Sequence, residues 1–323
     1  MKVVDRQIVK IIKEICEENH IPIKIYSHGW IMQLEINREF IYIFGYQFQN
    51  NNSAAQLICE DKAALSEILE SCNISAVKHH FFVSPNTRHY IEATDCWTEM
   101  IGLLDKYGVI VCKKNDGSGG NGVFKVETRL ELEIAVDNLF RNNRNLVISP
   151  YYEIEVEYRV IVLNNKTELI YSKERMFVEG NGVDTIKELV SEKYANQDNI
   201  FLSNLSLLSL LNSIDSSDCD LVLEAGRKYN LNWKHNLGKG AEPIILQDEK
   251  EKENLTDIAL SAAAVIGVNF ASVDIIKTAK GEYLILEINS GIMMEQFAKH
   301  SEEYYKIAKE IYKKAVYSND TRR

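Results

Sequence analysis

The sequence predicts an α+β fold in which most strands pair as hairpins. Short β-branched runs alternate along the 323-residue chain with amphipathic runs of helical period. A glycine-rich turn at 116–122 separates two β-branched runs, and Asn164-Asn165 separates two more, a dipeptide that favours a tight hairpin turn. Strands joined by tight turns run antiparallel, so a doubly wound parallel sheet is disfavoured.

The N-terminal elements are predicted as a helix, two strands and a second helix. Residues 5–18 form an amphipathic helix with Asp5 as its N-cap, because isoleucines recur there at helical spacing. The strands span 23–26 and 40–44, and the second helix spans 61–71.

The central elements surround the glycine-rich turn. A helix over about 94–107 leads into the strand 109–113, the turn itself and the strand 123–126. Thr128 and Glu131 have the spacing of a capping box, so a helix begins at Thr128.

The second half of the chain is predicted to hold further strands, a polar insertion and two helices. In order these are the strand 146–149, the hairpin 158–163 with 168–173, the mostly helical insertion 184–231, the helix 255–266, the strand pair 272–277 with 282–289, and the helix 301–316.

Composition limits the function classes. The chain is 46% hydrophobic and carries a net charge of −10, which predicts a globular protein without a nucleic-acid partner. Six cysteines lack any paired short spacing and are expected to be reduced core residues. Neither a signal peptide nor an apolar run of membrane-spanning length is recognised, so we expect a cytoplasmic protein without a membrane partner.

The glycine-rich turn is the first candidate site. Gly117, Gly119 and Gly122 fit G-x-G-x-x-G, but the run that follows is β-branched, so the turn links two strands and opens no helix. Such a hairpin tip can cover phosphates with backbone N–H groups, and Lys113 ends the strand that enters it. The alternative is an ordinary surface turn with a solvated lysine. No kinase catalytic motif and no Walker A sequence is present.

The second candidate site is acidic. Glu287 and Asn289 share one face of a strand, and a two-residue turn at Lys280-Gly281 would place Asp274 directly opposite Glu287. Two carboxylates and an amide oxygen are ligands that Mg²⁺ prefers. The alternative is a set of solvent-facing acids on an edge hairpin.

Several segments together resemble a known family. The run S-A-A-Q-L-I-C-E-D-K at 53–62 is similar to S-A-x-A-x-x-I-A-x-D-K, the run at 178–189 resembles V-x-G-D-G-x-x-T-I-x-E-L, and 236–241 resembles N-L-x-x-G-G. With the glycine loop and the acidic strands, this order of motifs resembles the ATP-grasp superfamily, above all the ATP-grasp domain shared by cyanophycin synthetase and the fused bacterial glutathione synthetases. The resemblance covers roughly 29–301.

The resemblance implies an ATP-grasp fold of three lobes, with the nucleotide between the central lid and the C-terminal lobe. The implied lobes are an N-terminal lobe at 1–85, a lid with the glycine-rich loop at 86–155, and a C-terminal lobe with the magnesium-binding strands at 156–323.

It also implies roles for residues that match the family's motifs. Asp274, Glu287 and Asn289 match the metal ligands, while Arg159, Arg175 and Asn236 match groups near the reacting atoms. The implied nucleotide-binding residues are Lys62, Lys113, Gly117, Ser118, Gly119, Gly120, Tyr151, Tyr152 and Glu157.

The implied activity is that of an ATP-dependent carboxylate–amine ligase, which forms an amide bond through an acyl phosphate and uses two Mg²⁺ ions, with Mn²⁺ as a substitute. Two other functions stay open, namely a catalytically silent ATP-binding scaffold, and a carboxylase or phosphotransferase of the same fold. The expected substrates are small amino acids or peptides, although a protein tail also stays open as acceptor, and the resemblance allows a homodimer.

Overall fold

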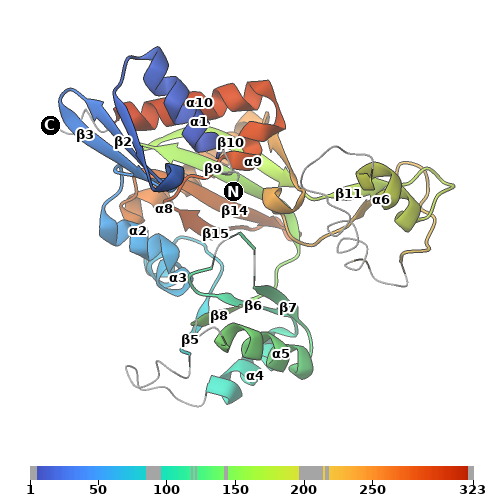
Figure 1. The fold of residues 1–323 in the computed structure, drawn as a ribbon. Coiled ribbons are helices and arrows are strands. Elements are labelled where there is room, and N and C mark those ends of the chain that lie inside the picture. The colour runs from blue at the N-terminus through green and yellow to red at the C-terminus, as the bar shows by residue number, and fades with distance from the viewer. Residues whose placement is uncertain are drawn as a thin grey trace. The chain divides into compact units, whose positions relative to one another are not determined.

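The computed structural model describes residues 6–84, 96–117, 119–120, 122–141, 145–195, 214 and 218–318. It confirms the α+β class. The chain divides into two compact units, one formed by Met1–Ser172 with Ile245–Arg323 and the other by Lys173–Ile244 (Figure 1). The three lobes inferred from the sequence stay a prediction.

A five-stranded sheet with the order β13-β10-β9-β14-β15 organises the larger unit. Its strands are β9 (Ile154–Leu163), β10 (Lys166–Glu174), β13 (Glu242–Ile245), β14 (Phe270–Thr278) and β15 (Tyr283–Asn289). The predicted hairpin between β9 and β10 is confirmed, and Asn164 and Asn165 turn the chain with φ values of 48° and 59°.

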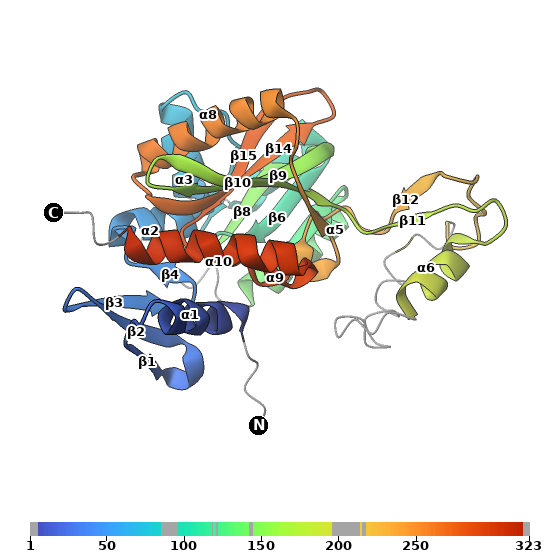
Figure 2. The same ribbon diagram turned by 90° about the horizontal axis from the view of Figure 1, so that it is seen from above.

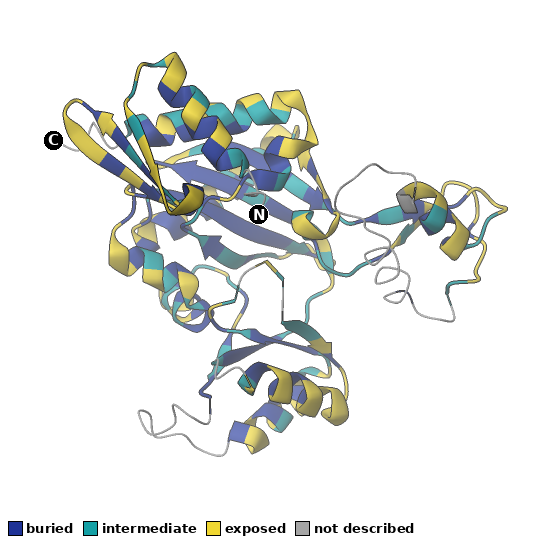
Figure 3. Cartoon of the chain, in the orientation of Figure 1, coloured by how far each residue is buried: buried dark blue, intermediate teal, exposed yellow. Residues whose placement is uncertain are grey.

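Helices cover the sheet on both faces (Figure 2). On one face, α8 (Glu249–Ile266), α2 (Ser53–Glu60) and α3 (Lys62–Ser71) pack on buried strand residues such as Val160 and Val273. On the other face, α9 (Glu295–His300) packs Phe297 against Tyr171 of β10, and α10 (Glu302–Tyr317) follows it. The central strand β14 is therefore almost entirely buried, whereas the edge strands β13 and β15 are more exposed (Figure 3).

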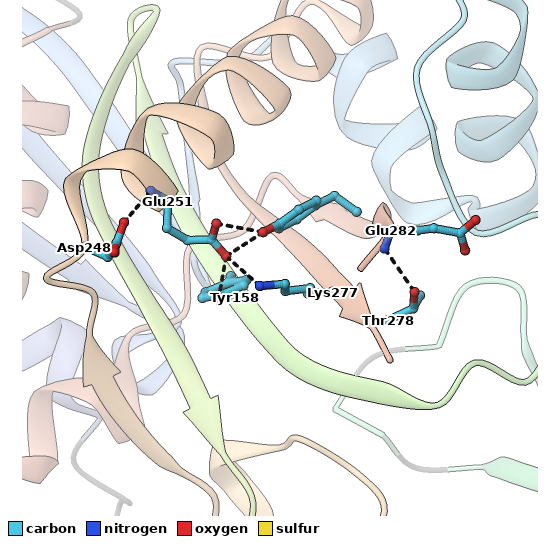
Figure 4. A network of polar contacts seen from close by, with 7 residues as sticks. Tyr158, Asp248, Glu251, Lys277, Thr278 and Glu282 are labelled. Carbon is cyan, nitrogen blue, oxygen red and sulfur yellow. Dashed lines mark hydrogen bonds and ion pairs between the residues drawn. The ribbon is translucent and has the colours of Figure 1, made fainter. Parts of the chain in front are cut away.

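One carboxylate attaches α8 to three strands of this sheet. Glu251 accepts hydrogen bonds from the hydroxyls of Tyr158 on β9, at 2.8 Å, and Tyr283 on β15, at 2.7 Å, and its carboxylate lies 3.8 Å from the ammonium of Lys277 on β14 (Figure 4). Because neighbouring side chains on a strand point to opposite faces, Arg159 and Asp274 point away from α8.

A second sheet has the order β5-β8-β6-β7. Its strands are β5 (His80–Phe82), β6 (Ile110–Lys114), β7 (Val123–Val126) and β8 (Leu146–Pro150), and its helices are α4 (Cys96–Tyr107) and α5 (Arg129–Phe140). The predicted capping box is confirmed, because the Glu131 N–H donates to Thr128 Oγ1 at 3.2 Å and Glu131 Oε2 accepts from the Thr128 N–H at 3.0 Å.

The N-terminal sheet contains β1 (Ile23–Tyr26), β2 (Ile31–Ile36), β3 (Glu39–Phe44) and β4 (Gln47–Phe48), beside α1 (Gln7–Glu18). The predicted cap of α1 is wrong: Arg6 is the N-cap residue, and the carboxylate of Glu295 accepts the N–H groups of Gln7 at 2.7 Å and Ile8 at 3.1 Å. Asp5 itself lies outside the described residues.

The smaller unit contains α6 (Ile186–Ala195), the short antiparallel pair of β11 (Phe177–Glu179) with β12 (Lys228–Asn230), and a 3-10 turn over Leu237–Lys239. Part of the polar insertion predicted to be helical, at 196–213 and 215–217, lies outside the described residues. Within the described parts of the chain, no helix is both long enough and apolar enough to cross a bilayer.

Candidate active site

The predicted pairing of Asp274 with Glu287 is confirmed, but the turn that produces it differs from the prediction. Asp274 faces Glu287 across β14 and β15, and Ser272 faces Asn289. The predicted two-residue turn is wrong, because Lys277 pairs with Tyr283 and the turn is longer. A β-bulge at Leu286 then adds one residue to β15 and restores the predicted pairing of the two carboxylates.

Asp274 is held by an arginine on the neighbouring strand. Arg159 Nε donates to Asp274 Oδ1 and Arg159 Nη2 to Asp274 Oδ2, both at 2.7 Å. The Asp274 side chain is 1% exposed. Burial lowers the pKa of Arg159, but the charge and hydrogen bonds of Asp274 outweigh it and raise that pKa well above its ordinary value. Arg159 is therefore charged.

The acidic face also fits a hard metal ion. Among the described residues no cluster of three His, Cys, Asp or Glu side chains forms a metal site, so the site would have to include the amide of Asn289. Asn289 Nδ2 donates to Glu287 Oε1 at 3.0 Å, which leaves the amide oxygen as a further oxygen donor. Asp274 contributes two carboxylate oxygens to the same face. The three residues therefore offer the oxygen ligands that Mg²⁺ takes.

Lys62 links α3 to the start of the glycine-rich loop. It is the first residue of that helix, it is buried, and its ammonium donates to the carbonyl of Gly117 and, at 3.5 Å, to that of Asn115. The Asn115 side chain accepts the N–H of Ala63 at 3.1 Å, so the helix and the loop are joined at several points.

Lys113 brings β6 and the acidic strands into one electrostatic environment. It lies near the end of β6 and is 8% exposed. Burial and then the charge of Lys62 lower its pKa to about 8, whereas the charges of Glu287 and Glu157 oppose that change. The two lysines and the two acids therefore gather in one region of the larger unit.

The remaining predicted nucleotide-binding residues lie in the glycine-rich loop, directly after β8 and on β9. Gly119 and Gly120 both have a φ of 70°, which glycine adopts without strain, while Ser118 lies outside the described residues. After β8, the Tyr151 N–H donates to Val109 O at 3.1 Å, and burial raises the pKa of the half-buried Tyr152. Glu157 is buried on β9.

Arg175 and Asn236 belong to the smaller unit and are described only within it. Asn236 Oδ1 accepts the N–H of Gly238 at 2.8 Å and so caps the 3-10 turn of its own loop. Burial lowers the pKa of the neighbouring His235 to about 4, and the charge of Arg175 adds to that effect.

Sequence reasoning missed two residues beside the lysines. Asn115 is buried and its side chain anchors the start of α3. His79 is buried just before β5, and the charges of Lys113 and Lys62 both act on it. Neither role is apparent from the sequence, because a single asparagine after a strand and a histidine in an apolar run are common structural residues.

Two surface grooves lie elsewhere in the larger unit. One, of about 530 Å³, is lined by residues of α1, α9 and α10, and the other, of about 570 Å³, runs along β3 to the start of α2. Neither is lined by a residue of the predicted site.

Comparisons with known proteins show which proteins the chain is similar to. Residues 220–314 match the family model of the RimK-like ATP-grasp domain. The chain is 26% identical over 260 residues to cyanophycin synthetase of Trichormus variabilis, covering 76% of this chain and 28% of the relative. It is 26% identical over 207 residues to the glutathione biosynthesis bifunctional protein of Listeria monocytogenes, covering 59% of this chain and 26% of the relative. The chain thus spans little more than a quarter of these relatives.

Solved structures show the fold. The bifunctional glutathione synthetase from Pasteurella multocida matches with a TM-score of 0.57 at 16% identity, covering 94% of this chain and 43% of the other. D-alanine–D-alanine ligase from Bacillus anthracis matches with a TM-score of 0.51 at 16% identity, covering 84% of this chain and 71% of the other. The chain therefore has the fold of these two enzymes, and its residues 220–314 match the model of the RimK-like ATP-grasp domain.

Proposed function

We propose that the chain is an ATP-dependent carboxylate–amine ligase that forms an amide bond through an acyl phosphate. The observation that carries the proposal is the environment of Lys113, which lies within electrostatic reach of Lys62 and Glu287 at once. A group within electrostatic reach of both the second lysine and the acidic strands is where a triphosphate with its metal ion would be held. The names of the similar proteins, which are synthetases and ligases, support the same reaction class.

The first step is phosphoryl transfer. An oxygen of the substrate carboxylate attacks the γ-phosphorus of ATP, the bond to the β–γ bridging oxygen breaks, and ADP leaves. Lys62 and Lys113 hold the phosphate oxygens, and the glycine-rich loop excludes water from the acyl phosphate. Mg²⁺ held by Asp274, Glu287 and Asn289 would offset the negative charge of the phosphates. Two such ions are expected, and Mn²⁺ is an acceptable substitute.

The second step is acyl transfer. The nitrogen of the amine attacks the acyl carbon, the bond from that carbon to the phosphate oxygen breaks, and the amine loses a proton. Arg159 positions Asp274 and is proposed to stabilise the oxyanion of the tetrahedral intermediate, where one donor is worth about 3 kcal/mol. Arg175 and Asn236 are proposed for the same role from their sequence motifs alone.

The substrates proposed are a small carboxylic acid and an amino acid or short peptide, because the names of the similar proteins describe synthetases of such products. Homodimerisation stays part of the proposal.

The proposal is tested by measuring ADP release with a panel of amino acids and dipeptides, followed by mass spectrometry of the products. Lys113→Ala and Glu287→Ala should abolish ADP release. The matched controls are the exposed Lys306→Ala on α10 and Glu70→Ala on α3, which should retain it. Hydroxylamine in place of the amine should yield a hydroxamate of the carboxylate in step with ADP. ADP release that needs no carboxylate, or full turnover of either site variant, would contradict the proposal.

A further inference from the structure

The residue behind this inference is His79, which lies between α3 and β5. Its side chain is buried, with 5% of the residue exposed. Its backbone N–H lies 3.4 Å from Ser66 Oγ, and Ser66 follows Lys62 by one helical turn of α3. The histidine is therefore fixed against the helix that begins with the first lysine of the site.

Neither ring nitrogen of His79 makes a hydrogen bond in the described structure, although both are buried. Buried polar atoms in folded proteins are almost always paired, and leaving two of them unpaired on one ring costs stability. Such an arrangement is common where a ligand supplies the missing partner, as at a binding site.

The surroundings of the ring decide what that partner can be. Burial, then the charges of Lys113, Lys62 and His80, hold the pKa of His79 well below its usual range, so the ring is neutral. The Val77 backbone acts on the ring as a hydrogen-bond acceptor and opposes this shift, although it does not meet the geometry of a regular hydrogen bond to either ring nitrogen. A neutral imidazole has one donor and one acceptor nitrogen. An ammonium group can donate to the acceptor, but no lysine can accept from the ring N–H, which needs an anionic or carbonyl oxygen.

We propose that His79 is a further nucleotide-binding residue, whose ring N–H donates a hydrogen bond to a phosphate oxygen of the ATP held by Lys62 and Lys113. Its second nitrogen accepts a hydrogen bond from one of these two ammonium groups and so orders it for the phosphate chain. The inference rests on the proposed function only in placing a nucleotide at the two lysines. It adds a neutral donor that discriminates phosphate oxygens from any cation at the same place.

The test compares His79→Leu with the wild-type protein by calorimetric titration with MgATP and by thermal unfolding without nucleotide. Loss of a hydrogen bond to a charged group should weaken MgATP binding roughly tenfold to a hundredfold. Without nucleotide the variant should unfold at the same temperature as the wild type or higher, because leucine removes two unpaired buried polar atoms. His79→Gln or His79→Asn, each of which keeps a side-chain N–H, should recover part of the affinity.

The matched control is His80→Leu. His80 is only partly buried and its ring lies 6.3 Å from that of Tyr107, so this change should leave MgATP affinity unchanged. A measurement on the wild type needs no variant to fold: the ring ¹⁵N signals of His79 should shift in step with saturation by MgADP.

Two results would overturn the inference, namely wild-type MgATP affinity in His79→Leu, or ring ¹⁵N signals that stay fixed at saturation. The protein could bind MgATP, show the ring ¹⁵N shift of His79 and bind more weakly as His79→Leu, yet release no ADP that depends on a carboxylate. That result would refute the proposed ligase activity and leave the inference about His79 intact. A wild-type protein that does not bind MgATP would refute both.

Discussion

Arg159 and Asp274 form a bidentate ion pair across β9 and β14, with both N–O distances at 2.7 Å, and this pair fixes the carboxylate that faces Glu287. The arginine leaves Asp274 little rotational freedom, so one side of the acidic face is ordered without a metal ion. Breaking a buried pair by neutralising one partner leaves the other charge uncompensated.

Asp274→Asn should therefore lower the free energy of unfolding by about 3–5 kcal/mol, measured by urea denaturation. The control is Asp105→Asn, which removes the exposed partner of Arg129 and should cost about 1 kcal/mol or less. Equal effects of the two substitutions would mean that the buried pair contributes no more than a surface pair.

Lys113 should take up a proton when nucleotide binds. Its pKa of about 8 reflects burial and the charge of Lys62, and a phosphate anion beside it favours the charged form. Titration calorimetry with MgATP at pH 8.5, in buffers of different ionisation enthalpy, should show proton uptake. Lys113→Arg stays protonated and should bind with less uptake, so equal uptake by both proteins would place the proton elsewhere.

The same lysine should make stability depend on alkaline pH. Its pKa is about 8 in the folded chain and near 10.5 when unfolded, so between these values the folded state binds fewer protons. Its contribution to the free energy of unfolding therefore rises as pH increases from about 8 to about 10.5. Urea denaturation should show this rise to be larger in the wild type than in Lys113→Met. Parallel curves would contradict the depressed pKa.

Glu287→Gln should raise the Mg²⁺ concentration that supports half-maximal ADP release by roughly tenfold or more, because it removes a charged oxygen ligand. The exposed Glu253→Gln on α8 is the control and should behave as the wild type. Chelation with EDTA should stop ADP release and Mn²⁺ should restore it. An unchanged Mg²⁺ requirement in Glu287→Gln would remove this residue from the metal site.

Glu251→Gln should separate stability from nucleotide binding. The carboxylate accepts two tyrosine hydroxyls on the sheet face that points away from Asp274, so the substitution should cost about 1–3 kcal/mol of unfolding free energy. MgATP affinity should not change. A marked loss of affinity would mean that the two faces of the sheet are coupled.

Local signals in the sequence were sufficient for several elements. The Asn164-Asn165 turn and the capping box at Thr128 are set by neighbouring residues, and both are found. The strand β2 was also readable, since buried and more exposed residues alternate along Ile31–Ile36, but it was not predicted. The start of α8 was placed too late because its polar first turn, capped by Asp248, carries no apolar period.

Other features depend on residues far apart in the chain. The carboxylate of Glu295 caps α1 although it lies near the other end of the sequence, and no local sequence pattern predicts this contact. The bulge at Leu286 compensates a wrongly predicted turn, so Asp274 was placed opposite Glu287 for a partly wrong reason. His79 was not predicted as a site residue, because its candidacy depends on the charges of Lys113 and Lys62, which only the folded chain brings near it.

The most direct test is a crystal structure with a non-hydrolysable ATP analogue and Mg²⁺. The account predicts that the triphosphate contacts the ammonium groups of Lys62 and Lys113, while a metal ion on its phosphates is bound by Glu287 and Asn289. A nucleotide bound at another place, or one that contacts the lysines with no metal ion at the acidic strands, would contradict it.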